Sequence, residues 1–330
     1  MTRPWPAGAV TGIGSLPGTD ILEAMRLVAG EVPDLPYLPE LPGRGAGADM
    51  IGRAAALLVD LPVEIVPSGW RLTSRGGHDL RVACDYLDRD LDALEQVLGE
   101  FTGAVKVQVA GPWTLAASLE LPTGHRVVTD HGATRELAES LTEGVRRHLA
   151  DLARRMPRAA VVLQVDEPSL PSVLAGEVPT PSGWGSVRAV AADVVEQTLG
   201  SLLSVAETSV VHCCAPHAPL NLFRDAGADA LAVDAALLDA SMLDALGEAI
   251  DSGRAVFLGV VPAVDTPLSV DQVTERVERF WQALGFARSR LPEALVLSTA
   301  CGMAGASPGY ARRAMSVLRD CGRKLAEESD

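Results

Sequence analysis

The sequence predicts an α/β protein of the (β/α)8 barrel class, with one domain spanning residues 1–330. Short runs of apolar and β-branched residues recur along the chain, and longer stretches with helical periodicity separate them. The short runs are apolar at nearly every position, as expected of parallel strands that are buried on both faces. A doubly wound open sheet is the alternative that the same pattern permits.

Eight runs are expected to form the strands, namely 9–15 (AVTGIGS), 62–67 (PVEIVP), 104–110 (AVKVQVA), 159–166 (AAVVLQVD), 208–213 (TSVVHC), 229–234 (DALAVD), 254–261 (RAVFLGVV) and 294–299 (ALVLST). Between them, apolar residues return every three or four positions over polar faces, which predicts helices at 133–155, 187–206, 270–284 and 308–327. Long connections rich in glycine and proline precede the second and third strands.

Composition excludes several classes of function. The chain has 330 residues, of which 48% are hydrophobic, so it can bury a large core. Its 43 acidic and 28 basic residues give a net charge of −15, which argues against nucleic acid or an anionic membrane as a partner. No apolar run reaches membrane-spanning or signal-peptide length, so we expect a cytoplasmic protein. The five cysteines suit reduced thiols or metal ligands better than a disulfide framework.

Polar residues that end the predicted strands are the candidates for chemistry, because the active site of a barrel lies at the carboxyl ends of its strands. The motif VVHCCAP at 210–216 is the most informative. Side chains alternate along a strand, so His212 and Cys214 share a face and Cys213 points away. Imidazole and thiolate are zinc ligands, and Asp234 and Cys301 follow two further strands. Alternatively, Asp234 caps a helix and the cysteines are packing residues.

Two further motifs are candidates for substrate binding. Asp166 and Glu167 end the fourth strand and point in different directions, so one can bind a substrate amine while the other meets a helix or neighbouring backbone. The glycine-rich turn at 11–17 exposes backbone groups that can bind a carboxylate, although such a turn can also be only a turn. It lacks the spacing of a dinucleotide-binding fingerprint.

From about residue 11 to the C-terminus, the chain resembles the C-terminal catalytic barrel of cobalamin-independent methionine synthase in its short, stand-alone form. Six motifs in the family's order carry the resemblance: Gly12-Ile13-Gly14-Ser15-Leu16-Pro17, Ala110-Gly111-Pro112-Trp113-Thr114-Leu115, Gln164-Val165-Asp166-Glu167-Pro168, His212-x-Cys214, Asp234 and Cys301-Gly302.

The resemblance implies a zinc-dependent methyltransferase that converts homocysteine to methionine with a methyl-folate donor. It implies that His212, Cys214, Asp234 and Cys301 bind Zn2+, with Asp234 where the family has Glu. It further implies that Asp166 holds the substrate amino group. The backbone of Ile13, Gly14 and Ser15 would hold the substrate carboxylate.

The chain departs from the family pattern at three places. The stretch 259–267 lacks the histidine that the family uses as a proton donor, and Asp265 is the candidate to replace it. The family's H-G-E motif is absent near 44–50, where Glu40 is the nearest acidic candidate. The tryptophan expected to stack on the folate aligns with Ser118, while Trp113 is displaced. The resemblance therefore implies that zinc and thiol handling are retained and that methyl-donor handling is altered.

Three alternative functions remain open at this point. A thiol methyltransferase that takes its methyl group from a corrinoid or another carrier fits the missing folate features. A uroporphyrinogen-decarboxylase-like enzyme would need arginines and aspartates at the first strand ends, and the thiol-rich rim argues against it. A non-catalytic zinc- or thiol-binding paralogue would explain the missing histidine.

Overall fold

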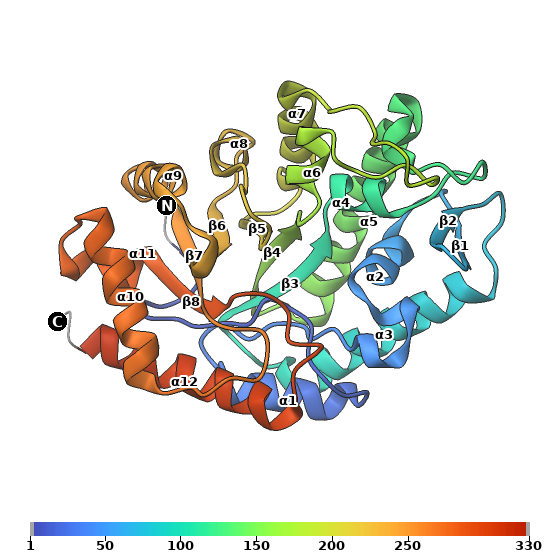
Figure 1. Ribbon diagram of the computed structural model, residues 1–330. Coiled ribbons are helices and arrows are strands. Elements are labelled where there is room, and N and C mark those ends of the chain that lie inside the picture. The colour runs from blue at the N-terminus through green and yellow to red at the C-terminus, as the bar shows by residue number, and fades with distance from the viewer. Residues whose placement is uncertain (1–2, 328–330) are drawn as a thin grey trace.

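The computed structural model describes residues 3–327, and its centre is a parallel sheet of six strands in the order β3-β4-β5-β6-β7-β8. Figure 1 shows this sheet curling, with helices packed along its outer side. The strands are β1 (Val63–Val66), β2 (Gly69–Leu72), β3 (Ala104–Ala110), β4 (Ala160–Asp166), β5 (Ser209–Cys213), β6 (Ala230–Asp234), β7 (Ala255–Val261) and β8 (Leu295–Thr299). The α-helices are α1 (Ile21–Glu31), α2 (Met50–Leu57), α3 (His78–Leu98), α4 (Pro112–Ser118), α5 (His131–Arg155), α6 (Leu170–Ala175), α7 (Ala192–Leu203), α8 (Leu220–Asp225), α9 (Ala240–Asp251), α10 (Val270–Leu284), α11 (Leu291–Ala294) and α12 (Pro308–Glu327).

Two extended N-terminal segments lie between the edges of this sheet. An isolated parallel bridge joins Val10 to Leu297 of β8, and another joins Tyr37 to Lys106 of β3. A third parallel bridge, between Ser15 and Glu40, joins the two segments to each other. The expectation of a strand at 9–15 is therefore wrong. Neither segment forms a regular strand, because glycine and proline interrupt both.

The expectation that residues 62–67 form the second barrel strand is wrong. They form β1, which pairs with β2 as an antiparallel hairpin outside the six-stranded sheet. The run PVEIVP has suitable β propensity, but its Pro67-Ser68-Gly69 ending favours a tight turn back on itself. The position beside β3 belongs instead to the segment around Tyr37, whose neighbour Leu38 donates its backbone N–H to Lys106 O at 3.0 Å.

The helices at 270–284 and 308–327 have the predicted bounds, and 133–155 begins two residues earlier as α5. Ser269 caps α10 by accepting the N–H of Gln272, and Gly285 ends that helix with φ of 74°. The helix predicted at 187–206 is shorter, because Val187 instead donates its N–H to Val178 O at 2.7 Å. That bond closes a projecting hairpin before α7 begins.

Apolar residues form two cores, one on each face of the sheet. The larger core lies between the strands and the surrounding helices. The smaller one fills the concave side near the start of the strands, with Val162, Val210, Phe257 and Val296 among its members. Further along the strands the concave side becomes polar and carries Lys106, Gln164 and His212 in place of these residues. The strand alternation therefore places a buried polar layer above an apolar floor.

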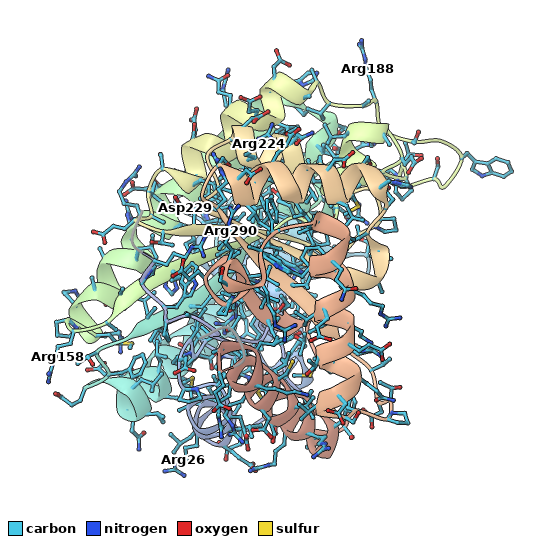
Figure 2. The ribbon with its side chains drawn as sticks, turned by 90° about the vertical axis from the view of Figure 1, so that its left-hand side faces the viewer. Arg26, Arg158, Arg188, Arg224, Asp229 and Arg290 are labelled. Carbon is cyan, nitrogen blue, oxygen red and sulfur yellow. The ribbon has the colours of Figure 1, made fainter. Side chains whose placement is uncertain are left out.

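The residues labelled in Figure 2 show which end of the sheet is which. Arg158 and Asp229, which precede β4 and β6, lie toward the left of that view and mark the side where strands begin. The coil that carries Arg188 lies toward the right. Among residues 3–327, no helix combines the length and apolar character required to cross a membrane.

Trp184 lies in the projecting hairpin, where it is 94% exposed, whereas Trp5, Trp70, Trp113 and Trp281 are at most 7% exposed. We expect acrylamide to quench mainly the fluorescence of Trp184, because the quencher must contact the indole. The Trp184→Phe variant should therefore lose most of the quenchable emission. Quenching that survives this substitution at the wild-type level would contradict the described burial.

Candidate functional site

Asp166 and His212 end adjacent strands and meet across the β4–β5 pair. They are register partners, and His212 Nδ1 lies 2.8 Å from Asp166 Oδ1. The imidazole is 3% exposed, yet its Nε2 has no hydrogen-bond partner among the described residues. A buried imidazole normally has both nitrogens satisfied. The carboxylate thus fixes the ring while Nε2 is free to bind another group.

Cys214 and Cys301 come together from two different strand ends. Their sulfur atoms are 3.0 Å apart, whereas Cys213 lies in the outer apolar core, as the alternation predicts. The hydrogen bond between the two thiols lowers the pKa of Cys301 to about 6 and raises the pKa of Cys214. Either sulfur can be the donor of this hydrogen bond. His212 lies close enough to lower the pKa of Cys301 further.

The segment Ile13 to Ser15 joins both of these pairs. Lys106 Nζ and Gln164 Nε2 each donate to the Ile13 carbonyl at 2.9 Å, and Gln164 Nε2 also donates to Asp166 Oδ1 at 2.7 Å. At its other end the Ser15 carbonyl accepts the N–H of Met303 at 2.7 Å. A Cβ on Gly302 would lie 2.0 Å from Ser15 Oγ, so a larger residue there would displace the Ser15 hydroxyl.

Glu40 extends the site on the side of the N-terminal segments. It is 4% exposed, and burial raises the pKa of its carboxyl to about 7, with Arg53 opposing and Asp166 reinforcing the shift. Its Oε1 lies 3.7 Å from Arg53 Nε. Gln108 Nε2 donates to Leu38 O at 2.7 Å, and Gln108 Oε1 has no partner among the described residues. Gln164 Oε1 is also unpartnered. Both amide oxygens are therefore buried hydrogen-bond acceptors that remain available to another group.

Lys106 should make stability depend on pH. Burial lowers the pKa of its ammonium group from an ordinary 10.5 to about 7. Between these values the unfolded chain binds more protons, so the free energy of unfolding should rise with pH, by about 1 kcal/mol per pH unit. Urea titrations at pH 7.5 and 9.5 should show this rise in wild type and not in Lys106→Met. An equal change in the free energy of unfolding with pH in the two proteins would contradict a lowered pKa of Lys106.

Glu167 faces away from the site and holds α4. Its carboxylate accepts the backbone N–H groups of Trp113 at 3.0 Å and Thr114 at 2.8 Å, together with the Thr114 hydroxyl at 2.8 Å. The neighbouring carboxylates of Asp166 and Glu167 therefore serve different elements, one the polar interior and the other a helix N-terminus.

Asp234 and Asp265 both accept hydrogen bonds from nearby backbone N–H groups instead of contacting the other predicted site residues. Asp234 ends β6, and its Oδ1 accepts the N–H of Ala236 at 2.9 Å, so it caps a short 3-10 helix (Ala235–Leu237). Asp265 lies in the loop after β7, where hydrogen bonds from Ser307 lower the pKa of its carboxyl. A role as proton donor would require that carboxyl to be protonated first.

The imidazole and thiol groups at the site are ligand types that suit zinc, although they do not surround a single position in this structure. Within residues 3–327, no three or more His, Cys, Asp or Glu side chains are arranged as a metal site. The unpartnered His212 Nε2 and the adjacent Cys214 and Cys301 thiols nevertheless supply the ligand types that zinc prefers, and Asp166 supports the imidazole from behind. The capping bond of Asp234 would have to change before it could join them.

Sequence reasoning missed the roles of Lys106, Gln108 and Gln164, and it gave Glu40 only as the acidic residue nearest to the absent H-G-E motif. A signal for the first three was present. In AVKVQVA and VVLQVD, polar residues occur at alternating positions inside strands that are otherwise apolar, which places them on the concave face. Glu40 had no such signal, because it lies in an irregular segment.

The fold and site together define an α/β protein with histidine, thiols and carboxylates at the carboxyl ends of a curled parallel sheet. The chain belongs to the family described as the cobalamin-independent synthase catalytic domain, which it matches over residues 8–324.

The first of two similar solved structures supports this fold. A B12-independent methionine synthase from Shewanella sp. W3-18-1, in complex with selenomethionine, is 15% identical with a TM-score of 0.64 and 98% coverage of both chains. A β-mannanase from Alicyclobacillus acidocaldarius is 12% identical with a TM-score of 0.46 and also 98% coverage of both chains. A search of curated proteins returned no match.

Proposed function

We propose that this protein is a zinc-dependent methyltransferase that methylates a thiol, namely homocysteine, to give methionine. The observation that carries the proposal is the buried, unpartnered Nε2 of His212 beside the Cys214–Cys301 thiol pair. Membership of the cobalamin-independent synthase family supports it, as does the similarity in fold to a B12-independent methionine synthase.

His212, Cys214 and Cys301 would hold the zinc, and Asp234 would join them as the fourth protein ligand or leave that position to the substrate. Bound zinc stabilises a thiolate at neutral pH, where a free thiol is mostly protonated. Asp166 orients His212 through Nδ1, and the hydrogen bonds from Lys106 and Gln164 fix the Ile13 carbonyl beside it.

The buried polar layer suits the amino acid part of homocysteine. Asp166 and Glu40 offer carboxylates to the substrate ammonium, and the free amide oxygens of Gln108 and Gln164 add acceptors. The backbone of Ile13, Gly14 and Ser15 would bind the substrate carboxylate. These contacts would hold the substrate sulfur near Cys301, because Ser15 packs against Gly302.

Methyl transfer then forms one bond and breaks another. The substrate sulfur forms a bond to the methyl carbon, and the bond from that carbon to the donor nitrogen breaks, leaving its electron pair on nitrogen. With a folate-type donor that nitrogen must receive a proton. Asp265 remains the predicted proton donor, and it would have to lose its bond to Ser307 to act.

We further propose that the whole chain, residues 1–330, acts as one barrel domain in which the segments around Val10 and Tyr37 occupy the first two of eight strand positions. The parallel bridges of Val10 with Leu297, Ser15 with Glu40 and Tyr37 with Lys106 support this arrangement. Such closure would place the Ile13–Ser15 segment and Glu40 on the same rim as the strand ends that carry His212 and Cys301.

Methionine formation tests the proposal. Zinc-loaded protein should convert homocysteine to methionine with 5-methyltetrahydrofolate, its polyglutamate form or methylcobalamin as the donor. The Cys301→Ala variant should lose at least about 10³-fold in rate, whereas Cys84→Ala, in α3, should retain the wild-type rate. Absence of methionine with all three donors, or an active Cys301→Ala protein, would refute the proposal.

A further inference from the structure

A cavity of about 630 Å³ extends outward from the candidate site between β7, α9 and α10. Figure 1 shows α9 and α10 beside β7. Cys301 and Asp234 lie at its inner end, and Arg276 and Arg279 of α10 line another part of its wall. We name it the Cys301 cavity. Its volume is within the range of small-molecule sites.

Small residues at the end of β7 and directly after it line this cavity. Gly259, Val260, Pro262 and Ala263 line it where the family pattern would place a histidine. Gly259 is required there, because a Cβ would lie 2.6 Å from the Ala300 Cα and 2.8 Å from the Val233 carbonyl oxygen. The same stretch that lacks the expected proton donor therefore provides a wall without bulky side chains.

The cavity combines apolar walls with positive charge. Leu238, Leu243 and Phe280 supply apolar surface. Arg276 donates to the Val260 carbonyl at 2.9 Å, and no ion pair of Arg276 or Arg279 with a carboxylate occurs within residues 3–327. Two arginines without carboxylate partners are suited to an anion.

We propose that the Cys301 cavity binds a small molecule with an apolar body and an anionic group, and that this ligand is the methyl donor. The second part rests on the proposed methyl transfer. The anionic group lies against Arg276 and Arg279, and the apolar body lies along Leu238, Leu243 and Phe280. Continuity with Cys301 brings the other end of the ligand to the thiol site. The donor thus enters from the β6–β7 side.

Binding of 8-anilinonaphthalene-1-sulfonate tests the cavity without any assumption about activity. This probe has an aromatic body and one sulfonate. Wild type should show a saturable fluorescence increase, and Ala263→Phe, which fills the cavity, should abolish it. Arg279→Gln, at an exposed position, should weaken the apparent affinity about threefold, the effect of losing one partly exposed charge pair.

Matched controls lie in a second groove of about 600 Å³ between α5 and α7. Ser201→Phe and Arg135→Gln change a small residue and an unpaired exposed arginine there, and both should bind the probe as wild type does. Unchanged binding in Ala263→Phe and Arg279→Gln, or loss of binding in Ser201→Phe, would overturn the proposal. If Ala263→Phe fails to fold, the apparent probe affinities of Arg279→Gln and Arg135→Gln are compared instead. Weaker binding in Arg279→Gln alone would support the proposal, and equal binding in the two variants would overturn it.

Steady-state kinetics test whether the ligand of the Cys301 cavity is the methyl donor. In an active preparation, Arg279→Gln should raise the KM for the methyl donor and leave the KM for homocysteine unchanged. A raised KM for homocysteine alone would overturn the assignment of the donor to this cavity. If the protein binds the probe as described but methylates no thiol, the proposed function fails and the anion site remains.

Discussion

Replacing Asp166 with Asn is expected to lower kcat/KM for methyl transfer about 10³-fold, the largest effect on activity at any position outside the thiols. In the proposed function Asp166 acts twice, since it holds His212 through Nδ1 and would offer a carboxylate to the substrate ammonium. Loss of a carboxylate behind a ligating histidine costs about 10- to 100-fold, and loss of a charged hydrogen bond costs a similar factor. Steady-state kinetics with varied homocysteine should therefore show a raised KM together with a reduced kcat.

Asp229→Asn is the matched control for this substitution. Asp229 directly precedes β6, so it lies at the end of the sheet where the strands begin, away from the candidate site (Figure 2). There it accepts hydrogen bonds from the backbone N–H and the hydroxyl of Ser209. It should lower the melting temperature and leave kcat/KM unchanged. An Asp166→Asn protein that folds and keeps kcat/KM within about tenfold of wild type would contradict the double role of Asp166.

Gly144→Ala is expected to have the largest effect on stability, a loss of about 2 to 3 kcal/mol. Gly144 lies within α5, where α5 crosses the end of α2, and an added Cβ would lie 1.9 Å from the Leu57 carbonyl oxygen. Helix propensity alone predicts the opposite sign, a gain of about 1 kcal/mol. Urea denaturation therefore distinguishes the packing effect from the propensity effect.

Gly247→Ala is the control for that experiment, because Gly247 also lies inside a helix, α9, with Leu284 Cδ2 no closer than 3.9 Å to an added Cβ. It should stabilise the protein by about 0.5 to 1 kcal/mol. If both substitutions stabilise the protein, the close contact between α5 and Leu57 does not exist.

Regular elements with strong patterns were predictable from sequence. The strands β3 to β8 and the helices α10 and α12 have long apolar runs or clear periodicity, and local chemistry such as Ser269 and Gly285 fixes their ends. The first two strand positions were not predictable to the same extent. The segment around Tyr37 is too short and too rich in proline to resemble a strand, while residues 62–67 resemble one and form a hairpin instead.

The candidate site shows the same division. His212, Cys214 and Asp166 follow directly from strand alternation, and the structure brings them into contact with Cys301 or with each other. Glu40 reaches the site only through tertiary packing of an irregular segment, which no local pattern encodes. For Asp234, sequence reasoning left two roles open, and the capping bond to Ala236 is the one that the structure describes.

Zinc content is the most direct test of the central claim. Elemental analysis of wild type purified under reducing, chelator-free conditions should find about one zinc per chain, since three or four protein ligands bind a single ion. Cys214→Ala and Cys301→Ala should each lose that zinc, and Cys84→Ala should keep it. Wild-type protein that takes up no zinc, or a Cys301→Ala variant that retains it in full, would contradict the account.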